Sequence, residues 1–150
     1  MNDLTPSGIP PVPEETPYAP PAGQIIPPPP AGGDAALTEN DKTMGMLSHL
    51  IAFAGVLIPF PFVNVIGPLV IWMTQRDKSA YIDYHGKESL NFQITVAIAG
   101  AIAFLSLFVI VGFLLLPAVA IYAVVMTLIA GIKAKEGVRY RYPYTLRLIK

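Results

Sequence analysis

Cysteine is absent from this chain of 150 residues, and charged residues make up only 13% of it. The first absence excludes disulfides, thiol nucleophiles and cysteine-ligated metals. The second is unusual, since ordinary soluble domains carry about 25% charged residues. No Asp, Glu, Lys or Arg occurs between Lys42 and Arg76, or between Glu88 and Lys133. Uncharged runs of about 18 residues or more predict membrane spans, so we expect a protein integral to a lipid bilayer.

The sequence also lacks the motifs that carry enzyme chemistry. It has no HExxH zinc motif, no GxSxG nucleophile motif, no phosphate-binding loop and no paired carboxylates inside an apolar run. Its two histidines, His49 and His85, stand alone, without the further ligands at short spacing that a metal site needs. We therefore expect no enzyme activity, no metal and no cofactor.

Lys and Arg are missing from residues 1–41, which hold six acidic residues, and eleven of the sixteen prolines fall within residues 1–33. Such a segment buries too little apolar surface to offset its ordering entropy, and proline favours extended polyproline II. Residues 1–37 are therefore predicted to form a disordered proline-rich arm. The arm is either a tether or a ligand for a soluble protein with a proline-binding groove.

Four predicted helices follow the arm and make an all-α, polytopic membrane domain at residues 38–135. A Thr38 cap with Asp41 three residues later predicts the first helix start. The uncharged stretch 43–75 is too long for one straight span and too short for two full ones. A full hairpin, a re-entrant loop and one tilted span all stay open for it. We expect about four membrane segments as two hairpins, with helices at about 39–58, 64–75, 83–112 and 116–135.

Small residues recur at helical spacing on several predicted helices. Ala97 and Ala101 are one such pair, and Gly45, Ser48 and Ala52 share a face of the first helix. In lipid, small residues let helices approach closely. This pattern predicts tight packing within the chain and self-association into a homo-oligomer.

Basic residues gather in the loop 76–88 and in the C-terminal tail 136–150. The excess of Lys and Arg assigns both segments to the cytoplasmic side of the cell membrane, and a first hairpin places the arm there too. Basic residues mixed with tyrosines favour a tail that lies along the headgroups, and we expect no nucleic-acid binding. The predicted interfacial anchors are Trp72, Arg76, Lys78, Arg139, Tyr140, Arg141 and Tyr142.

A few polar side chains stand inside or beside the apolar runs. Polar groups in lipid need partners, and Glu88, Asn91 and Thr95 share one helical face, for which His49 and Asn64 are expected partners. The cluster is either a polar clamp between the two hairpins or the lining of a hydrophilic path. Its candidate members are His49, Asn64, His85, Glu88, Asn91 and Gln93.

Several short stretches carry a family resemblance. Residues 48–50, 67–72, 85–93 and 140–143 read SHL, GPLVIW, HGKESLNFQ and YRYP. They resemble the small prokaryotic membrane proteins of domain-of-unknown-function family 4870, which is distantly similar to the plastid import component Tic-twenty. The resemblance covers about residues 41–150. It implies a polytopic helical protein and suggests a part in protein translocation, and it brings no catalytic residues.

The sequence leads to two functional hypotheses. The first is a non-enzymatic assembly or scaffold component of the membrane, whose proline-rich arm recruits a soluble partner. The alternative is an oligomeric channel or protein-translocation component, whose polar face lines a path through several copies.

Overall fold

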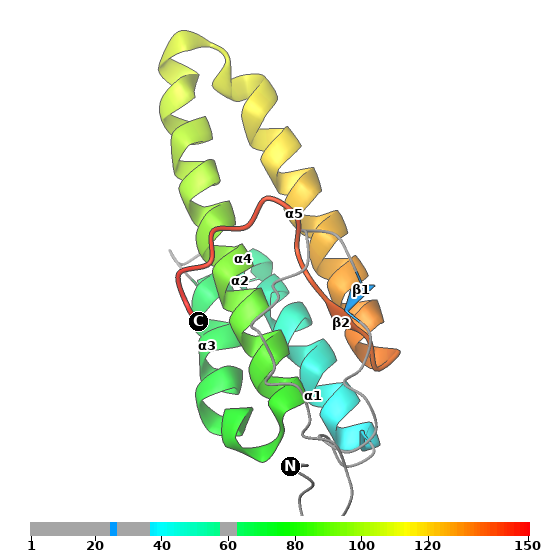
Figure 1. Ribbon diagram of the computed structural model, residues 1–150. Helices are drawn as coiled ribbons and strands as arrows, with labels where there is room; N and C mark the ends of the chain where they lie inside the picture. Colours follow the sequence, from blue (N-terminus) through cyan, green and yellow to red (C-terminus); the bar gives the residue numbers. More distant parts are fainter. Residues whose placement is uncertain (1–24, 27–36, 58–62) are drawn as a thin grey trace, which may run out of the picture.

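The computed structural model describes residues 25–26, 37–57 and 63–150, and within these it is helical (Figure 1). The predicted arm, apart from residues 25–26 and 37, lies outside the described residues. Two-residue strands β1 (Ile25–Ile26) and β2 (Arg139–Tyr140) pair antiparallel. The helices are α1 (Glu39–Leu50), α2 (Ala54–Leu57), α3 (Val63–Gln75), α4 (Ala80–Leu105) and α5 (Gly112–Lys135), with 3-10 turns at Ile51–Phe53, Arg76–Lys78 and Ser106–Val109.

A reciprocal cap fixes the start of α1 where the sequence predicts it. The Asp41 amide donates to Thr38 Oγ1 at 3.1 Å, and the Thr38 amide donates to Asp41 Oδ2 at 2.9 Å. Both groups would otherwise be unsatisfied at a helix N-terminus. The first turn of α1 is therefore set by residues that are adjacent in sequence.

Helix α4 begins at Ala80, three residues before the expected start at 83. Ser79 supplies the cap, since its Oγ accepts from the Tyr81 amide at 3.2 Å. Asp83 and Lys87, one helical turn apart, form an ion pair at 2.6 Å, which supports the helix in the favoured acid-first order. The expected loop 76–88 is thus mostly helix.

The turn between α4 and α5 falls at residues 106–111, and α5 begins at Gly112 instead of at 116. A Cβ on Gly112 would lie 2.4 Å from the Leu107 amide nitrogen and 2.5 Å from the Ala103 carbonyl oxygen. Only glycine fits this close approach of two backbones. Pro117, which the sequence suggests as the end of the turn, lies inside α5.

The described helices form two parts of different character (Figure 1). We call the first part the body: α1, α2, α3, residues 80–95 of α4 and residues 122–135 of α5, which pack on one another. We call residues 96–121 the apolar hairpin, because there α4 and α5 extend beyond the body with large apolar side chains exposed. The fully buried large side chains include Tyr81, Ile82, Leu90, Phe92, His49, His85 and Tyr142.

Most of the described glycines lie so close to other parts of the chain that a Cβ atom in their place would contact them. A Cβ on Gly45 would lie 2.8 Å from the Tyr81 ring, and one on Gly86 would lie 2.5 Å from Trp72. A Cβ on Gly100 would meet no described heavy atom within 4 Å. Close packing inside the chain therefore uses glycines of the body and Gly112 at the turn, and self-association stays a prediction.

Two of the described helical segments are long and apolar enough to cross a membrane: α4 with its following turn, residues 80–109, and α5. Only 17% and 11% of their most apolar windows are buried inside the protein, whereas the core helix of a soluble protein would be mostly buried. The prediction of a helical membrane protein is confirmed at this level. The expected number of four membrane segments stays a prediction. Helices α1 and α3, with 12 and 13 residues, are shorter than these two segments.

The C-terminal segment, residues 139–150, is not a separate tail. It runs back across α4 and α5 (Figure 1), and its position relative to the headgroups stays a prediction. Tyr140 is 8% exposed and Tyr142 is fully buried. The Tyr142 ring stacks on Phe92 of α4 with ring centroids 3.9 Å apart, because burying two aromatic faces together stabilises more than leaving one at an interface.

Candidate functional site: a buried polar cluster

Two histidines and a tyrosine from three distant parts of the chain form a hydrogen-bonded row inside the body. His49 Nε2 lies 2.9 Å from His85 Nδ1, and His49 Nδ1 lies 3.0 Å from the Tyr142 hydroxyl oxygen. All three side chains are fully buried. The row therefore joins α1, α4 and the C-terminal segment through polar contacts inside the body.

Uncharged side chains are sufficient to form the row. Each contact needs one proton, and either direction of donation along the row satisfies both ring nitrogens of His49 and Nδ1 of His85. Burial lowers the pKa of His49, which lies in α1 outside the two long apolar helices, from 6.5 to about 3. A neutral, fully buried imidazole suits a structural role more than proton transfer at neutral pH.

Glu88 of α4 holds the C-terminal segment from two sides. Its Oε2 accepts from the Tyr142 amide at 3.1 Å, and its Oε1 accepts from Arg147 Nε at 3.3 Å. Arg147 also donates to the Tyr142 carbonyl at 3.1 Å. Because Glu88 is only 7% exposed, these bonds replace the water that its carboxylate would otherwise need.

Asn91, one turn further along α4, binds the backbone of the same segment. Its Oδ1 accepts from the Leu148 and Ile149 amides at 2.9 and 2.8 Å, and its Nδ2 donates to the Ile149 carbonyl at 2.9 Å. Thr95 Oγ1 accepts from the Leu146 amide at 3.0 Å. The shared face of Glu88, Asn91 and Thr95 is therefore occupied by an extended stretch of the chain itself.

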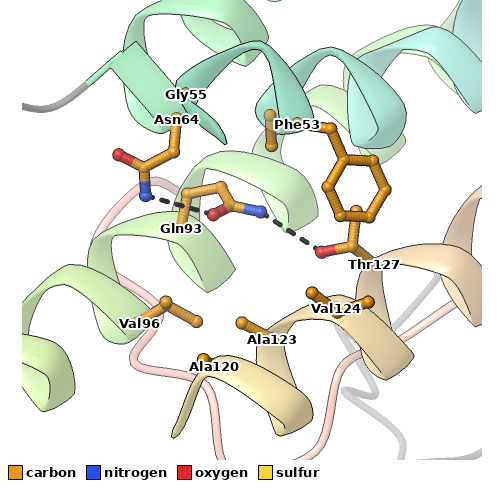
Figure 2. A pocket seen from close by; sticks show the side chains of 10 residues that line it. Phe53, Gly55, Asn64, Gln93, Val96, Ala120, Ala123, Val124 and Thr127 are labelled. Atoms are coloured by element: carbon orange, nitrogen blue, oxygen red, sulfur yellow. Dashed lines mark hydrogen bonds between the residues drawn. The ribbon is translucent and has the colours of Figure 1, made fainter. Parts of the chain in front are cut away.

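A second polar row crosses the body near the base of the apolar hairpin (Figure 2). Asn64 Nδ2 donates to Gln93 Oε1 at 3.3 Å, and Gln93 Nε2 donates to Thr127 Oγ1 at 3.4 Å. The row borders a cavity of about 250 Å³. Its other lining residues are mostly apolar: Ala52, Phe53, Gly55, Val96, Ala120, Ala123 and Val124.

The six candidate residues thus fall into two groups. Asn64, an expected partner for the polar residues of α4, contacts Gln93, whereas His49 contacts His85, a pair that the sequence did not predict. Glu88 and Asn91 instead bind the C-terminal segment, which the sequence reading assigned to the membrane surface. The distances do not decide between a clamp and a path, and both roles stay predictions.

Among the described residues, no group of three or more His, Cys, Asp or Glu side chains could hold a metal ion. The two buried histidines face each other through their ring nitrogens, so Nδ1 of His85 and both ring nitrogens of His49 are engaged in the row. The two polar rows together join α1, α3, α4, α5 and the C-terminal segment.

A scan against protein-family models matches residues 40–149 to the MamF/MmsF model, described as the magnetosome magnetite crystal formation protein family. This match spans well over half of the chain. The chain belongs to the magnetosome magnetite crystal formation protein family. Searches of the curated proteins and of the solved structures gave no match.

The MamF/MmsF match overturns the resemblance to family 4870 and Tic-twenty. The resemblance rests on four short stretches, whereas the family model matches residues 40–149. The translocation function that came with the resemblance is dropped. A non-enzymatic membrane component is consistent with a magnetosome membrane protein family.

The residues that match the MamF/MmsF model include the whole buried polar cluster, from His49 to Arg147, and exclude the entire proline-rich arm. They also include the predicted anchors. Trp72 Nε1 donates to Asp83 at 2.7 Å, and the Arg76 guanidinium lies 5.1 Å above the Trp72 ring. Lys78 is exposed at the end of the body near the start of α4. An interfacial position for these three stays a prediction.

Tyr142 and Arg147 are the contributors that sequence reasoning missed as part of the site. The YRYPY run was interpreted by its local composition, which is basic and aromatic. A signal was present in the alternation, because Tyr140 and Tyr142 stand two residues apart and project to the same side of an extended chain. The same spacing is expected whether the two tyrosine rings pack in the protein interior or lie at the membrane interface.

Proposed function

We propose that this chain is a non-enzymatic, integral component of the magnetosome membrane that takes part in magnetite crystal formation. The observation that carries the proposal is the family match over residues 40–149. Two long apolar helices support the membrane part. The buried polar cluster supports the non-enzymatic part, because its polar groups bind one another and the chain's own backbone.

The proposed role is structural. The body closes on its own C-terminal segment through Glu88 and Asn91, so it presents a fixed shape and its histidines are fully buried. A component of this kind acts by holding a binding segment at the membrane. We infer that the body places the proline-rich arm there, for a soluble protein that recognises extended proline-rich sequence.

Orientation follows from the basic residues. Both the start of α4 and the end of α5 carry Lys or Arg, and the two helices run up and back (Figure 1). The positive-inside rule assigns both ends to the cytoplasmic side. Of the four expected segments the proposal keeps α4 and α5, because the 13 residues of α3 reach only ~20 Å of a ~30 Å core.

Deletion of the chain in its magnetite-forming host tests the crystal role. We expect crystals whose size or shape distribution in electron micrographs differs from that of the parent, with recovery on return of the full chain. A host that lacks the chain and still forms crystals with the parental distribution contradicts the role. Recovery of the tagged chain in isolated magnetosome membranes tests the location separately.

Removal of residues 1–33 tests the arm. The shortened chain keeps Thr38 and Asp41, so the cap of α1 is retained. Affinity capture from the same membranes should lose at least one soluble partner that the full chain retains. An unchanged partner set would show that the arm is only a tether, while the crystal phenotype could still stand.

A further inference from the structure

The apolar hairpin has almost no polar chemistry of its own. Residues 96–121 contain no charged residue, and Ser106 carries the one side-chain hydroxyl among them. That hydroxyl donates to the Ile102 carbonyl at 2.8 Å. At the tip the side chains of Phe108 and Ile110 are 86% and 77% exposed. A loop that emerges into water would be expected to carry polar turn residues.

The backbone of the turn is closed on itself. The Ile110 amide donates to the Leu107 carbonyl at 3.0 Å, the Phe113 amide to Ile110 at 3.1 Å, and the Leu114 amide to Val111 at 3.0 Å. In hydrocarbon no water can take the place of a missing partner, so a turn survives there only when its polar groups are satisfied internally. This turn meets that condition for the amides named.

Ile110 occupies a turn position at which glycine or asparagine is usually found. Its φ is +69°, in the left-handed region that favours glycine or asparagine. A β-branched side chain there costs roughly 1–2 kcal/mol. In water, asparagine or glycine would relieve the cost. In hydrocarbon, an asparagine side chain would need a partner, so an apolar side chain is favoured in spite of the strain.

The C-terminal segment is our marker for the level at which water begins. It is irregular backbone, and it crosses α4 and α5 at the level where Thr95 binds the Leu146 amide and Tyr122 Oη donates to the Pro143 carbonyl. Irregular backbone exposed to lipid does not occur inside the hydrocarbon. Tyr144, at this level, is 89% exposed and has the position of an interfacial aromatic residue.

The length of the hairpin above this level is too short for a crossing. Residues 96–105 of α4 reach about 15 Å, and residues 112–121 of α5 also reach about 15 Å, at 1.5 Å per residue. The hydrocarbon core is about 30 Å thick. We propose that the apolar hairpin inserts from the side of the body and that its turn, residues 106–111, ends inside the hydrocarbon without emerging on the far face.

The partner of this surface is therefore the acyl chains of the near leaflet and of the bilayer centre. The long helices α4 and α5 meet the length criterion for a span only because the body halves, 80–95 and 122–135, are counted with the hairpin. The proposal rests on the membrane location of the chain. It does not depend on the role in crystal formation.

Single-cysteine variants of the full chain test the depth, and the absence of native cysteine makes each label unique. Lys78→Cys reports the side of the body, and Phe108→Cys reports the tip. Sealed vesicles are treated with a membrane-impermeant maleimide from one face and then from the other. We expect Lys78→Cys to react from one face, and Phe108→Cys to react at least about tenfold less from either face, because the hydrated thiolate is the reactive form.

Two labelling results overturn the proposal. Reaction of Phe108→Cys from the face opposite to Lys78→Cys shows a complete crossing, and reaction from the same face shows a hairpin that is not inserted. Loss of Lys78→Cys from the membrane fraction contradicts the membrane location itself, which separates the two failures.

Fluorescence quenching measures the depth of the tip. It distinguishes a tip near the bilayer centre from one just beneath the headgroups of the far leaflet. Trp72 is the one tryptophan, so Trp72→Phe combined with Phe108→Trp gives a single emitter at the tip. We expect stronger quenching by lipids with a nitroxide deep in the acyl chain than by lipids with a nitroxide near the headgroup. Stronger quenching by the shallow nitroxide would place the tip at an interface and overturn the proposal.

Discussion

At the scale of single residues, the side chain of Asn91 makes several hydrogen bonds to the backbone of the C-terminal segment. One amide side chain satisfies three backbone groups of Leu148 and Ile149. Side-chain amides are well suited to this, since they offer a donor and an acceptor with the spacing of a peptide group. The end of the chain is therefore ordered by one side chain of α4.

Asn91→Leu should release the end of the C-terminal segment. The substitution keeps the volume but leaves three part-buried backbone groups without this partner, at a cost of about 0.5–1.5 kcal/mol for each lost hydrogen bond. We expect faster tryptic cleavage after Arg147 in mild detergent, measured by mass spectrometry. Asn64→Leu is the control, because Asn64 bonds Gln93 on the other row. Equal cleavage rates in the two variants would contradict this role.

Protonation of His49 in the unfolded chain makes the free energy of unfolding depend on pH. In the folded protein its pKa is lowered to about 3 by burial, while the unfolded chain has the ordinary value near 6.5. Below pH 6.5 the unfolded state therefore binds a proton that the folded state does not. The free energy of unfolding should fall by up to ~1.4 kcal/mol per pH unit from this residue.

Thermal unfolding in detergent between pH 7.5 and pH 5 measures this effect above the range in which carboxylates titrate. We expect the melting temperature to fall steadily below pH 6.5. His49→Gln, which cannot be protonated, should show a flatter profile and a lower melting temperature at pH 7.5. A profile with the same slope as that of the unmodified chain would show that His49 is not the titrating group.

At the scale of helices, two glycines of α4 differ in what surrounds them. A Cβ on Gly86 would lie 2.5 Å from Trp72 Cδ1 and 2.9 Å from Trp72 Cβ, whereas a Cβ on Gly100 would meet no described heavy atom within 4 Å. Gly86 therefore allows α3 and α4 to pack through the tryptophan. Gly100 faces open space on the apolar hairpin.

Alanine at these two positions should have opposite effects. Gly86→Ala overpacks the contact with Trp72 and should destabilise the chain by about 1–3 kcal/mol. Gly100→Ala should stabilise it by roughly 0.5–1 kcal/mol, because alanine loses less conformational entropy in a helix. Melting temperatures of the two variants in one detergent measure the difference. A destabilised Gly100→Ala variant would indicate a contact partner at the hairpin.

The helices also show which features a sequence reveals. The Thr38–Asp41 cap and the Asp83–Lys87 pair are predictable, because their partners lie within one turn. The turn at 106–111 is not, because its place depends on a backbone approach that only Gly112 allows. The contacts from His49 to His85 and to Tyr142 join residues 36 and 93 positions apart. No local pattern specifies such pairs, and the basic, aromatic composition around Tyr142 favoured the wrong environment.

At the scale of the whole molecule, stability and membrane attachment belong to different parts of the chain. The buried polar rows and the stacked rings of Phe92 and Tyr142 lie in the body. The exposed apolar surface is richest on residues 96–121. An apolar surface of this kind favours lipid regardless of how the body is packed. The two parts should therefore respond differently when the C-terminal segment is removed.

A chain that ends after Val138 should unfold more easily and still remain in the membrane. It loses the buried rings of Tyr140 and Tyr142, worth about 1.5–3 kcal/mol each, and it leaves Glu88 without Arg147 and the Tyr142 amide. We expect a lower melting temperature together with unchanged retention in membranes washed at alkaline pH. A chain that ends after Ile149 is the control, since it keeps every contact named here. If the shorter chain were washed out of the membrane, attachment would depend on the body, because the apolar hairpin is intact in both chains.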